Sequence, residues 1–409
     1  MILLYGYGIG NKSIEKYLIK NSIVYDIYED NQHWNKDISK YSLIIKSSGI
    51  PLDTDLIKLS KQFNIPIITD LEMFYKIVQN KHIIAITGSN GKTTTTSLLG
   101  YLLDCNYEVC GNIGIPLFDK IDSNKNYIIE TSSYMLECIS TFKPNIFVLL
   151  NIEKHHLEHH KTFINYIKAK IKPLKNMNNN DIIIYNYDDI IIRRIVDTYS
   201  LKKYSFSLNN RNVDCFYENH YINLQDEYQF DTNNLNLFGR HNIMNVMASL
   251  LVLKSLNIND LNKYFQKINT FKPLPHRLEL FLSNKYPSTI FINDSKSTNY
   301  YSTKVAITSV KNKYKTNDII LLLGGKKEEL SKEQIISLSN DVYRTLVFGE
   351  ISNLIQDEYI KFSDLLSLCN YLKKIDIKNK IILFSPGEPS FDEFKSFEER
   401  GNYFKYQFR

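Results

Sequence analysis

The chain has 409 residues, of which 43% are hydrophobic and 23% are charged, a balance that excludes a disordered or fibrous protein. This length predicts about two to four domains, each with its own core. The net charge of +6 is scattered along the chain, and no basic block is interleaved with aromatic residues, so we expect no nucleic-acid partner.

Cysteine usage and apolar runs predict the compartment. The five cysteines form no Cys-x-x-Cys pair, which indicates reduced thiols and neither a disulfide framework nor a zinc site. The first apolar segment, Ile2–Tyr5, is too short for a signal peptide. No run reaches the roughly 18 apolar residues that a membrane span needs. We therefore expect a cytoplasmic protein with no membrane partner.

The first eighty residues predict a small α/β domain. Expected strands alternate with helix-like segments, and these strands cover residues 2–5, 23–28, 43–46 and 65–68. Glycines after the first strand, with Glu29 and Asp30 about twenty residues later, resemble a dinucleotide-binding pattern. Asn11, however, stands where that pattern requires its third glycine. NAD binding and the binding of another ligand by this domain both stay open.

A phosphate-binding loop is predicted at residues 87–91. The apolar run 83–86 indicates a buried strand, and a helix is expected over residues 92–103. Glycines let backbone N–H groups approach phosphate oxygens, and the helix start adds unpaired N–H donors. The loop lacks the first glycine of the commonest nucleotide-loop pattern, and an ordinary tight turn is the alternative. The residues expected to contact a nucleoside triphosphate are Gly88, Asn90, Gly91, Lys92, Thr93 and Thr94.

Candidate metal ligands follow two further expected strands. Glu130 ends the strand expected at 127–129, at the sheet edge where ligands bind, and is therefore a candidate Mg²⁺ ligand. Four histidines lie within residues 155–160, after the strand expected at 146–150. The chain offers no matching Cys or His group elsewhere, so most of them are interpreted as solvated loop residues. A single metal-binding histidine is the alternative.

The remaining segments predict further α/β structure, including a third α/β domain. Lys168 and Lys170 lie on an amphipathic helix, where a solvated face is the ordinary interpretation. After a strand expected at 182–185, the residues through 231 are predicted to be irregular. A helix is expected at 242–256, and prolines make 271–275 a rigid linker. Further strands are expected near residues 289–292, 319–323, 345–348 and 381–384.

Together these motifs resemble the Mur ligase family, the ATP-dependent amino-acid ligases of peptidoglycan precursor synthesis. The resemblance runs almost the full length, through residues 87–94, 111–116, 130–137, 151–170, 239–245, 274–277, 293–299, 323–326 and 385–401. The segment Glu-Thr-Ser-Ser-Tyr at 130–134 and the C-terminal segment point to the branch that adds D-glutamate. The middle motifs are shared with folylpolyglutamate synthetases.

The resemblance implies an α/β fold of three domains and a reaction. A Rossmann-like N-terminal domain, a central P-loop ATPase-like domain with a mostly parallel sheet and a Rossmann-like C-terminal domain are expected, at residues 1–81, 82–272 and 273–409. They would bind the UDP-linked substrate, ATP and the amino acid. The implied activity adds D-glutamate to UDP-N-acetylmuramoyl-L-alanine through an acyl phosphate, with ATP and two Mg²⁺ ions, in a monomer.

The resemblance also implies roles for single residues. Catalytic roles fall to Lys92, Glu130, His156, Lys170 and Lys296. The implied metal ligands are Thr93, Glu130, His156 and Lys170, the last as a carbamate. The nucleotide side adds Asn242, Asn245, Arg277 and Asp294. Substrate contacts are expected from Asn112, Ser132, Lys296, Thr298, Lys326, Ser390 and Phe397.

Departures from the family pattern leave other functions open. His155 stands where the family usually has Asp, and Met135 replaces a Gln. Glu388 adds a charge near the expected amino-acid pocket. A sister ligase with another acceptor, a folate-type ligase and a degenerate ATP-binding protein are therefore the alternatives to the D-glutamate ligase.

Overall fold

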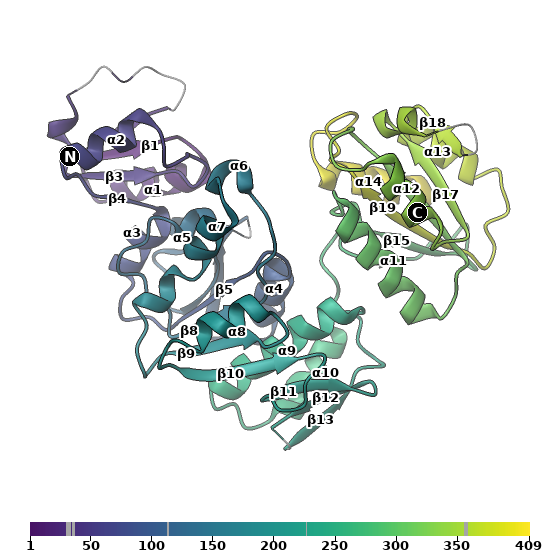
Figure 1. Cartoon of the computed structure of the whole chain (residues 1–409), viewed down its shortest axis with the longest axis horizontal. Coiled ribbons are helices and arrows are strands. Elements are labelled where there is room, and N and C mark those ends of the chain that lie inside the picture. Colours follow the sequence, from purple (N-terminus) through teal and green to yellow (C-terminus); the bar gives the residue numbers. More distant parts are fainter. Residues whose placement is uncertain (30–33, 35–36, 113, 226, 356–358) are drawn as a thin grey trace. The chain divides into compact units, whose positions relative to one another are not determined.

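The chain folds into an α/β protein with sheets that are mostly parallel (Figure 1), as the sequence predicts. This computed structural model describes residues 1–29, 34, 37–112, 114–225, 227–355 and 359–409. Asp30 of the dinucleotide interpretation and Ile113 of the 111–116 motif lie outside the described residues. Within these ranges no helix has the length and apolar character needed to cross a membrane.

The N-terminal sheet is parallel throughout, with strand order β2-β1-β3-β4. Its strands are β1 (Ile2–Tyr5), β2 (Tyr25–Tyr28), β3 (Leu43–Lys46) and β4 (Ile67–Ile68). Its helices are α1 (Ile9–Lys20), α2 (Asp55–Gln62) and α3 (Asp70–Ile77), with a short 3₁₀ turn at Ile38–Lys40. Strands β1 and β3 are largely apolar and buried, whereas β2 is mostly half-buried, and helices follow the strands as in a doubly wound fold.

The central sheet has the order β13-β12-β11-β10-β9-β8-β5-β7-β6. Its strands are β5 (Ile83–Thr87), β6 (Tyr107–Gly111), β7 (Asn126–Glu130), β8 (Ile146–Leu149), β9 (Ile182–Asn186), β10 (Lys202–Ser207), β11 (Cys215–Glu218), β12 (Tyr221–Leu224) and β13 (Tyr228–Asp231). The helices are α4 (Lys92–Leu102), α5 (Ser133–Leu136), α6 (Leu157–His160), α7 (Phe163–Lys170), α8 (Ile190–Val196), α9 (Arg240–Ser255) and α10 (Leu261–Thr270), with 3₁₀ turns at Leu117–Lys120 and Lys172–Lys175.

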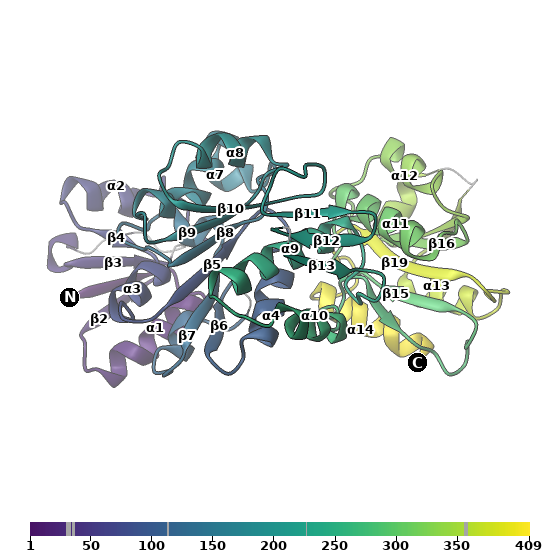
Figure 2. The same cartoon turned by 90° about the horizontal axis from the view of Figure 1, so that it is seen from below.

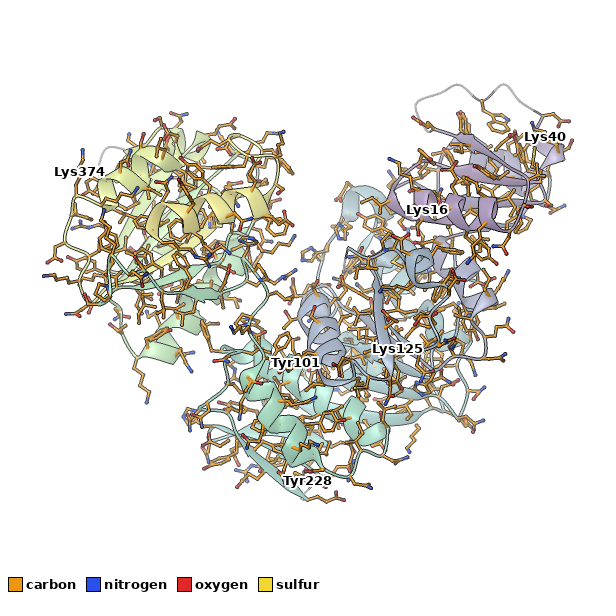
Figure 3. All side chains as sticks on the ribbon, turned by 180° about the vertical axis from the view of Figure 1, so that it is seen from behind. Lys16, Lys40, Tyr101, Lys125, Tyr228 and Lys374 are labelled. Atoms are coloured by element: carbon orange, nitrogen blue, oxygen red, sulfur yellow. The ribbon has the colours of Figure 1, made fainter. Side chains whose placement is uncertain are left out.

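Helices cover both faces of this central sheet. Helices α7 and α8 lie over one face, and α4 and α10 over the other (Figure 2). Tyr101 on α4 is directed toward α10, where its hydroxyl lies 3.2 Å from the hydroxyl of Thr270 (Figure 3). The sheet is thereby buried on both faces, and its middle strands carry the continuous apolar runs that such burial requires.

The expectation of irregular structure through residue 231 is wrong. The segment forms α8 and the strands β10 to β13, and β11, β12 and β13 pair antiparallel in sequence. The strands β11 to β13 have four residues each, and none of them is buried throughout, so they lack the buried apolar runs of the middle strands. Asn219 and His220, both with positive φ, make the two-residue turn between β11 and β12.

The C-terminal sheet has the order β14-β15-β19-β16-β17-β18, and only its β14–β15 pair is antiparallel among the described pairings. Its strands are β14 (Glu279–Phe281), β15 (Ile290–Asn293), β16 (Ile319–Gly324), β17 (Arg344–Phe348), β18 (Ile360–Phe362) and β19 (Ile381–Gly387). Its helices are α11 (Tyr300–Tyr314), α12 (Lys332–Ser339), α13 (Leu365–Leu372) and α14 (Phe397–Phe408), with a 3₁₀ turn at Glu350–Leu354.

The three sheets belong to two compact units. Unit 1 comprises residues 1–234 and 241–270, and unit 2 comprises 235–240 and 271–409. The first two sheets share one apolar core, in which Phe74 of α3 packs edge-on against Tyr127 of β7. Each sheet falls within one predicted domain, while the domain bounds themselves stay a prediction. The proline segment 271–275 forms neither helix nor strand and starts at the division between the units.

Glu72 joins the N-terminal helix α3 to the central part of unit 1. Its buried carboxylate accepts hydrogen bonds from the backbone N–H groups and hydroxyls of Ser140 and Thr141, at 2.6–2.9 Å. The N–H of Phe142 donates a further bond of 2.9 Å. Burial raises the pKa of Glu72, but these donors outweigh burial and the net pKa is lowered from its ordinary 4.5.

We expect Glu72→Ala to lower the free energy of unfolding by about 2 kcal/mol or more, because three backbone donors would lose their acceptor. A folded-state pKa below the unfolded value stabilises the fold at pH above about 4.5, and this contribution is lost as the pH falls through the folded pKa. Urea denaturation at pH 7 and pH 4 measures both effects. The exposed Glu329→Gln serves as control, and an equal loss at both pH values would contradict the account.

Candidate active site

The predicted phosphate-binding loop connects β5 to α4. Its backbone is anchored to the segment after β8: the Ser89 N–H donates to the Asn151 carbonyl (2.9 Å), and the Asn90 N–H to the Asn151 side chain (2.7 Å). Gly91 has φ = 84°, a left-handed conformation that disfavours side chains. A Cβ at Gly91 would also lie 2.4 Å from the Asn245 side-chain oxygen. The loop is thus a fixed strand–turn–helix element.

Lys92 is the first residue of α4, and its ammonium turns back over the loop. The Nζ donates to the carbonyls of Gly88 (2.8 Å) and Ser89 (3.0 Å). Thr93 and Thr94 follow in the first turn of the helix, and Thr94 is buried. A cation and the N–H groups of the helix start therefore share one small region, as anion binding requires.

Glu130 lies beside this loop at the end of β7. Strands β5 and β7 pair in parallel, so Glu130 is in register with Ile86, just before the loop. Its side chain is 1% exposed. One carboxylate oxygen accepts a bond from Asn112 (2.9 Å), whereas the other, Oε2, has no hydrogen-bond partner among the described residues. A buried carboxylate oxygen left without a donor is suited to a cation.

Lys170 approaches the same loop from α7. It is buried, which corrects the solvated-face interpretation, and its Nζ donates to the Gly88 carbonyl at 2.7 Å. Burial, and then the neighbouring Lys92, hold the pKa of Lys170 well below its usual value. Burial thus favours the neutral amine, the form that reacts with electrophiles such as carbon dioxide.

Tyr166 belongs to this group, although the sequence analysis did not identify it. Its hydroxyl lies 2.8 Å from that of Ser89, and its ring faces the Lys170 ammonium at 5.0 Å. Burial raises the pKa of Tyr166 to about 12, so it stays a neutral donor. Its position four residues before Lys170, on the same face of one helix, was the available signal.

The histidine segment is less solvated than predicted. His156 has a side chain 46% exposed, but those of His159 and His160 are 7% and 4% exposed. The ring of Tyr134 contacts all three. Burial lowers the pKa of His156 and lowers that of His160 to about 4, so both imidazoles are largely neutral at pH 7. Helix α6 explains the burial, since it turns its histidines onto α5.

The other residues predicted to contact the nucleotide are divided between the two units. Asn242 and Asn245 are buried on α9 in unit 1, and the Asn245 amide donates a hydrogen bond to the side-chain oxygen of Asn242 (3.1 Å). The Asn245 side chain also lies next to Gly91 of the loop. Asp294, in unit 2, accepts bonds from the Leu278 N–H (3.1 Å) and the Ser385 hydroxyl (2.8 Å). Burial raises the pKa of Asp294 to about 7, and Arg277 acts in the opposite direction.

Unit 2 contains the residues that the sequence predicts to contact the amino acid. The Lys296 ammonium lies over the Phe397 ring at 4.1 Å, with Thr298 two residues on. The Lys326 N–H donates to the Pro389 carbonyl (2.9 Å), next to the buried Ser390. Sequence reasoning gave no role to the buried Arg400, which donates to the carbonyls of Ser295 (2.9 Å) and Gly324 (3.3 Å) and so ties these loops together.

Two departures from the family pattern have structural explanations. Met135 is 3% exposed and packs in the apolar core of unit 1. Glu388 is fully buried and accepts hydrogen bonds from the N–H groups of residues 328, 329 and 330 at 2.7–3.1 Å. The concern that Glu388 places a free charge beside a carboxylate substrate is therefore not supported.

The remaining substrate candidates lie near the first two sheets. The Asn112 amide donates a hydrogen bond to Glu130, and the Ser132 hydroxyl caps α5 by accepting the Met135 N–H (3.2 Å).

A separate cavity of about 590 Å³ lies at the carboxyl ends of β1 and β3. Its lining residues are Gly6, Tyr7, Lys12, Glu29, Ser47, Gly49 and Ile50. This is the edge where doubly wound sheets bind ligands.

Comparison with known proteins identifies the class of this fold and site. A family model described as the Mur ligase middle domain matches residues 86–253, which include the loop, Glu130, the histidine segment and all but the last two residues of α9. The structure resembles that of MurF ligase from Thermotoga maritima in complex with ADP, with a TM-score of 0.64 and 19% identity over 100% of this chain and 93% of that one. MurC from the same organism gives a TM-score of 0.64 and 17% identity over 99% of each chain.

Relatives of similar sequence show to which branch of the Mur ligases the chain belongs. The chain is 31% identical to UDP-N-acetylmuramoylalanine–D-glutamate ligase of Rickettsia prowazekii (strain Madrid E), over 97% of this chain and 96% of the relative. It is 33% identical to the enzyme of the same name from Clostridioides difficile (strain 630), over 91% and 85%. The chain belongs to the family of UDP-N-acetylmuramoylalanine–D-glutamate ligases, within the Mur ligases. The expected enzyme class, an ATP-dependent ligase, is confirmed.

We expect Gly91→Ala to weaken ATP binding about tenfold or more, because a side chain would be strained at φ = 84° and would meet Asn245. Isothermal titration calorimetry with ATP measures this loss. Gly49→Ala is the matched control, since its Cβ would meet nothing within 4 Å. Unchanged ATP affinity in a folded Gly91→Ala protein would contradict the placement of the nucleotide at this loop.

Proposed function

We propose that the chain joins D-glutamate to UDP-N-acetylmuramoyl-L-alanine at the expense of ATP, in peptidoglycan precursor synthesis. The observation that best supports this reaction is the full-length similarity to the D-glutamate ligases. The grouping of Lys92, Glu130 and Lys170 around one phosphate-binding loop adds independent support. We place the reaction in the cytoplasm, carried out by a monomer with no nucleic-acid or membrane partner.

The chemistry needs a carboxylate to become a better acylating group. The alanyl carboxylate oxygen attacks the γ-phosphorus of ATP, ADP leaves, and an acyl phosphate results. The amine of D-glutamate then attacks the acyl carbon, loses a proton, and phosphate leaves as the amide forms. Phosphoryl transfer depends mainly on positioning and on neutralising charge. Lys92 and the N–H groups of the α4 start are placed for that role.

Two Mg²⁺ ions fit the residues of unit 1. Glu130 Oε2, which has no hydrogen-bond partner in the part of the chain that the structure describes, would hold one ion together with the Thr93 hydroxyl, because Mg²⁺ prefers oxygen ligands. His156 and Lys170 would hold the second, with Lys170 converted to a carbamate. When bound, the ions would supply positive charge that neutralises the phosphates. The carbamate forms when the neutral amine attacks carbon dioxide and releases a proton, and the lowered pKa of Lys170 favours this reaction.

The substrates are assigned to three domains with the bounds 1–81, 82–272 and 273–409. The cavity beside β1 and β3 would take the UDP end, with Asn112 and Ser132 toward the sugar. Asn242 and Asn245 would contact the adenine, and Arg277 and Asp294 the ribose and phosphates. D-Glutamate would be bound by unit 2, with the ammonium groups of Lys296 and Lys326 facing its carboxylates. Thr298, Ser390 and Phe397 complete that group.

Phosphate release from ATP tests the reaction directly. We expect release only when UDP-N-acetylmuramoyl-L-alanine and D-glutamate are both present, and a loss of at least a hundredfold in Lys92→Ala, because the charge on the phosphates would be less neutralised. Lys81→Ala, outside the loop, is the control. Release with another amino acid would indicate a sister ligase, and ATP binding without release would indicate a degenerate enzyme.

We expect Lys170→Ala to lose most activity and to regain part of it with added formate or acetate, because a small carboxylate can replace the carbamate. The measurement is phosphate release across a range of carboxylate concentrations. Lys168→Ala is the matched control, since Lys168 is exposed two residues earlier on α7. Absence of rescue at concentrations that leave the wild type active would contradict the carbamate.

A further inference from the structure

Lys46 is a buried lysine at the end of β3, with no exposed side-chain surface. Its Nζ donates to the carbonyls of Ile50 (2.6 Å), Ser47 (3.2 Å) and Ser48 (3.3 Å). These carbonyls belong to the loop 47–50, and Ser47, Gly49 and Ile50 of this loop line the 590 Å³ cavity. One ammonium therefore fixes the backbone of one wall of that cavity.

Glu137 is the counter-ion of Lys46 and comes from the central part of unit 1. It directly follows α5, and its Oε1 lies 2.7 Å from Lys46 Nζ. Its other oxygen, Oε2, lies 2.8 Å from His159 Nε2. The side chains of Glu137 and His159 are 4% and 7% exposed. Through Lys46, the single buried carboxylate of Glu137 thus joins the loop 47–50 to the histidine segment.

The histidine segment carries His156, the candidate metal ligand. His159 lies on α6, which starts one residue after His156. Tyr134, on α5, packs its ring against both histidines, with centroid distances of 5.0 Å and 4.4 Å. Moving His159 away from Glu137 would therefore disturb the Tyr134 ring, which also packs against His156.

The group formed by Glu137, His159 and His160 has the composition of a metal site, with its ligand atoms within 4.8 Å of one another. The charge balance argues against a metal here. The Lys46 ammonium already neutralises this carboxylate, and a divalent cation on the other oxygen would be repelled by it at short range. His160 directs its Nε2 to the Ser133 hydroxyl at 2.9 Å. The arrangement is that of a hydrogen-bonded network.

We propose that Lys46 and Glu137 are positioning residues that shape the nucleotide-sugar cavity and, through His159, hold the His156 segment. This inference rests on the proposed function, because it needs the UDP-linked substrate in the cavity and Mg²⁺ at His156. A buried ion pair that only stabilised the fold would be replaceable by an apolar pair of similar size without changing substrate affinity. The positioning role predicts that affinity changes even when stability is kept.

The test uses steady-state kinetics of the full chain, with KM measured separately for each substrate and activity titrated with Mg²⁺. We expect Lys46→Met to raise KM for UDP-N-acetylmuramoyl-L-alanine at least tenfold and to leave KM for D-glutamate within twofold. His159→Gln should raise the Mg²⁺ concentration for half-maximal activity at least fivefold, with KM for the UDP-linked substrate nearly unchanged. Lys40→Met is the control, since Lys40 forms an exposed pair with Asp26 in the same part of the chain.

The double variant Lys46→Met/Glu137→Gln removes both charges, so it should fold even if Lys46→Met alone does not. We expect it to combine the raised KM with the raised Mg²⁺ requirement. A folded double variant with both values within twofold of wild type would overturn the inference. Stoichiometric Co²⁺ binding that survives His156→Ala and is lost in His159→Gln would also overturn it, in favour of a metal site at Glu137, His159 and His160. A wild type without D-glutamate-dependent phosphate release would instead refute the proposed function, and this inference with it.

Discussion

The candidate ATP site depends on the carboxyl ends of three neighbouring parallel strands, β7, β5 and β8. Parallel pairing places Glu130 in register with Ile86, and Thr87 in register with Leu149, so that three loops start at one edge. Each loop supplies a different chemical group: an ammonium, a carboxylate and an imidazole. No long-range folding detail is needed beyond this register, which is why a site of this kind can be recognised from short motifs.

Burial as well as ion pairing affects the charged groups at that edge of the sheet. Lys92 and Lys170 both donate to the Gly88 carbonyl, and two ammonium groups so close in a desolvated site repel each other. The pKa of Lys170 falls because it is the more deeply buried, whereas Lys92 stands at the start of α4. The same loop therefore contacts two lysines in different surroundings, and burial disfavours the charged form of Lys170.

Much of the fold and of this edge could be predicted from the sequence, because long apolar strands and small-residue loops leave local patterns. Strands β1 and β3 have the predicted bounds, and the loop before α4 lies where expected. The strands β11 to β13 were missed because they have only four residues each and contain no buried apolar run. Contacts that depend on distant segments were also missed: the burial of His159 against Glu137, and that of Glu388 under residues 328–330.

The buried carboxylates show why position alone does not reveal a role. Glu72 and Glu388 accept several backbone N–H groups each, so their lone pairs are used and they hold loops in place. Glu137 divides its two oxygens between an ammonium and an imidazole, so it joins two loops. Glu130 is as buried as these, but among the described residues its Oε2 has neither a hydrogen-bond donor nor an ion-pair partner. Leaving a buried charge incompletely satisfied costs free energy. Because this oxygen lies beside a phosphate-binding loop, we propose it as a ligand for a cation.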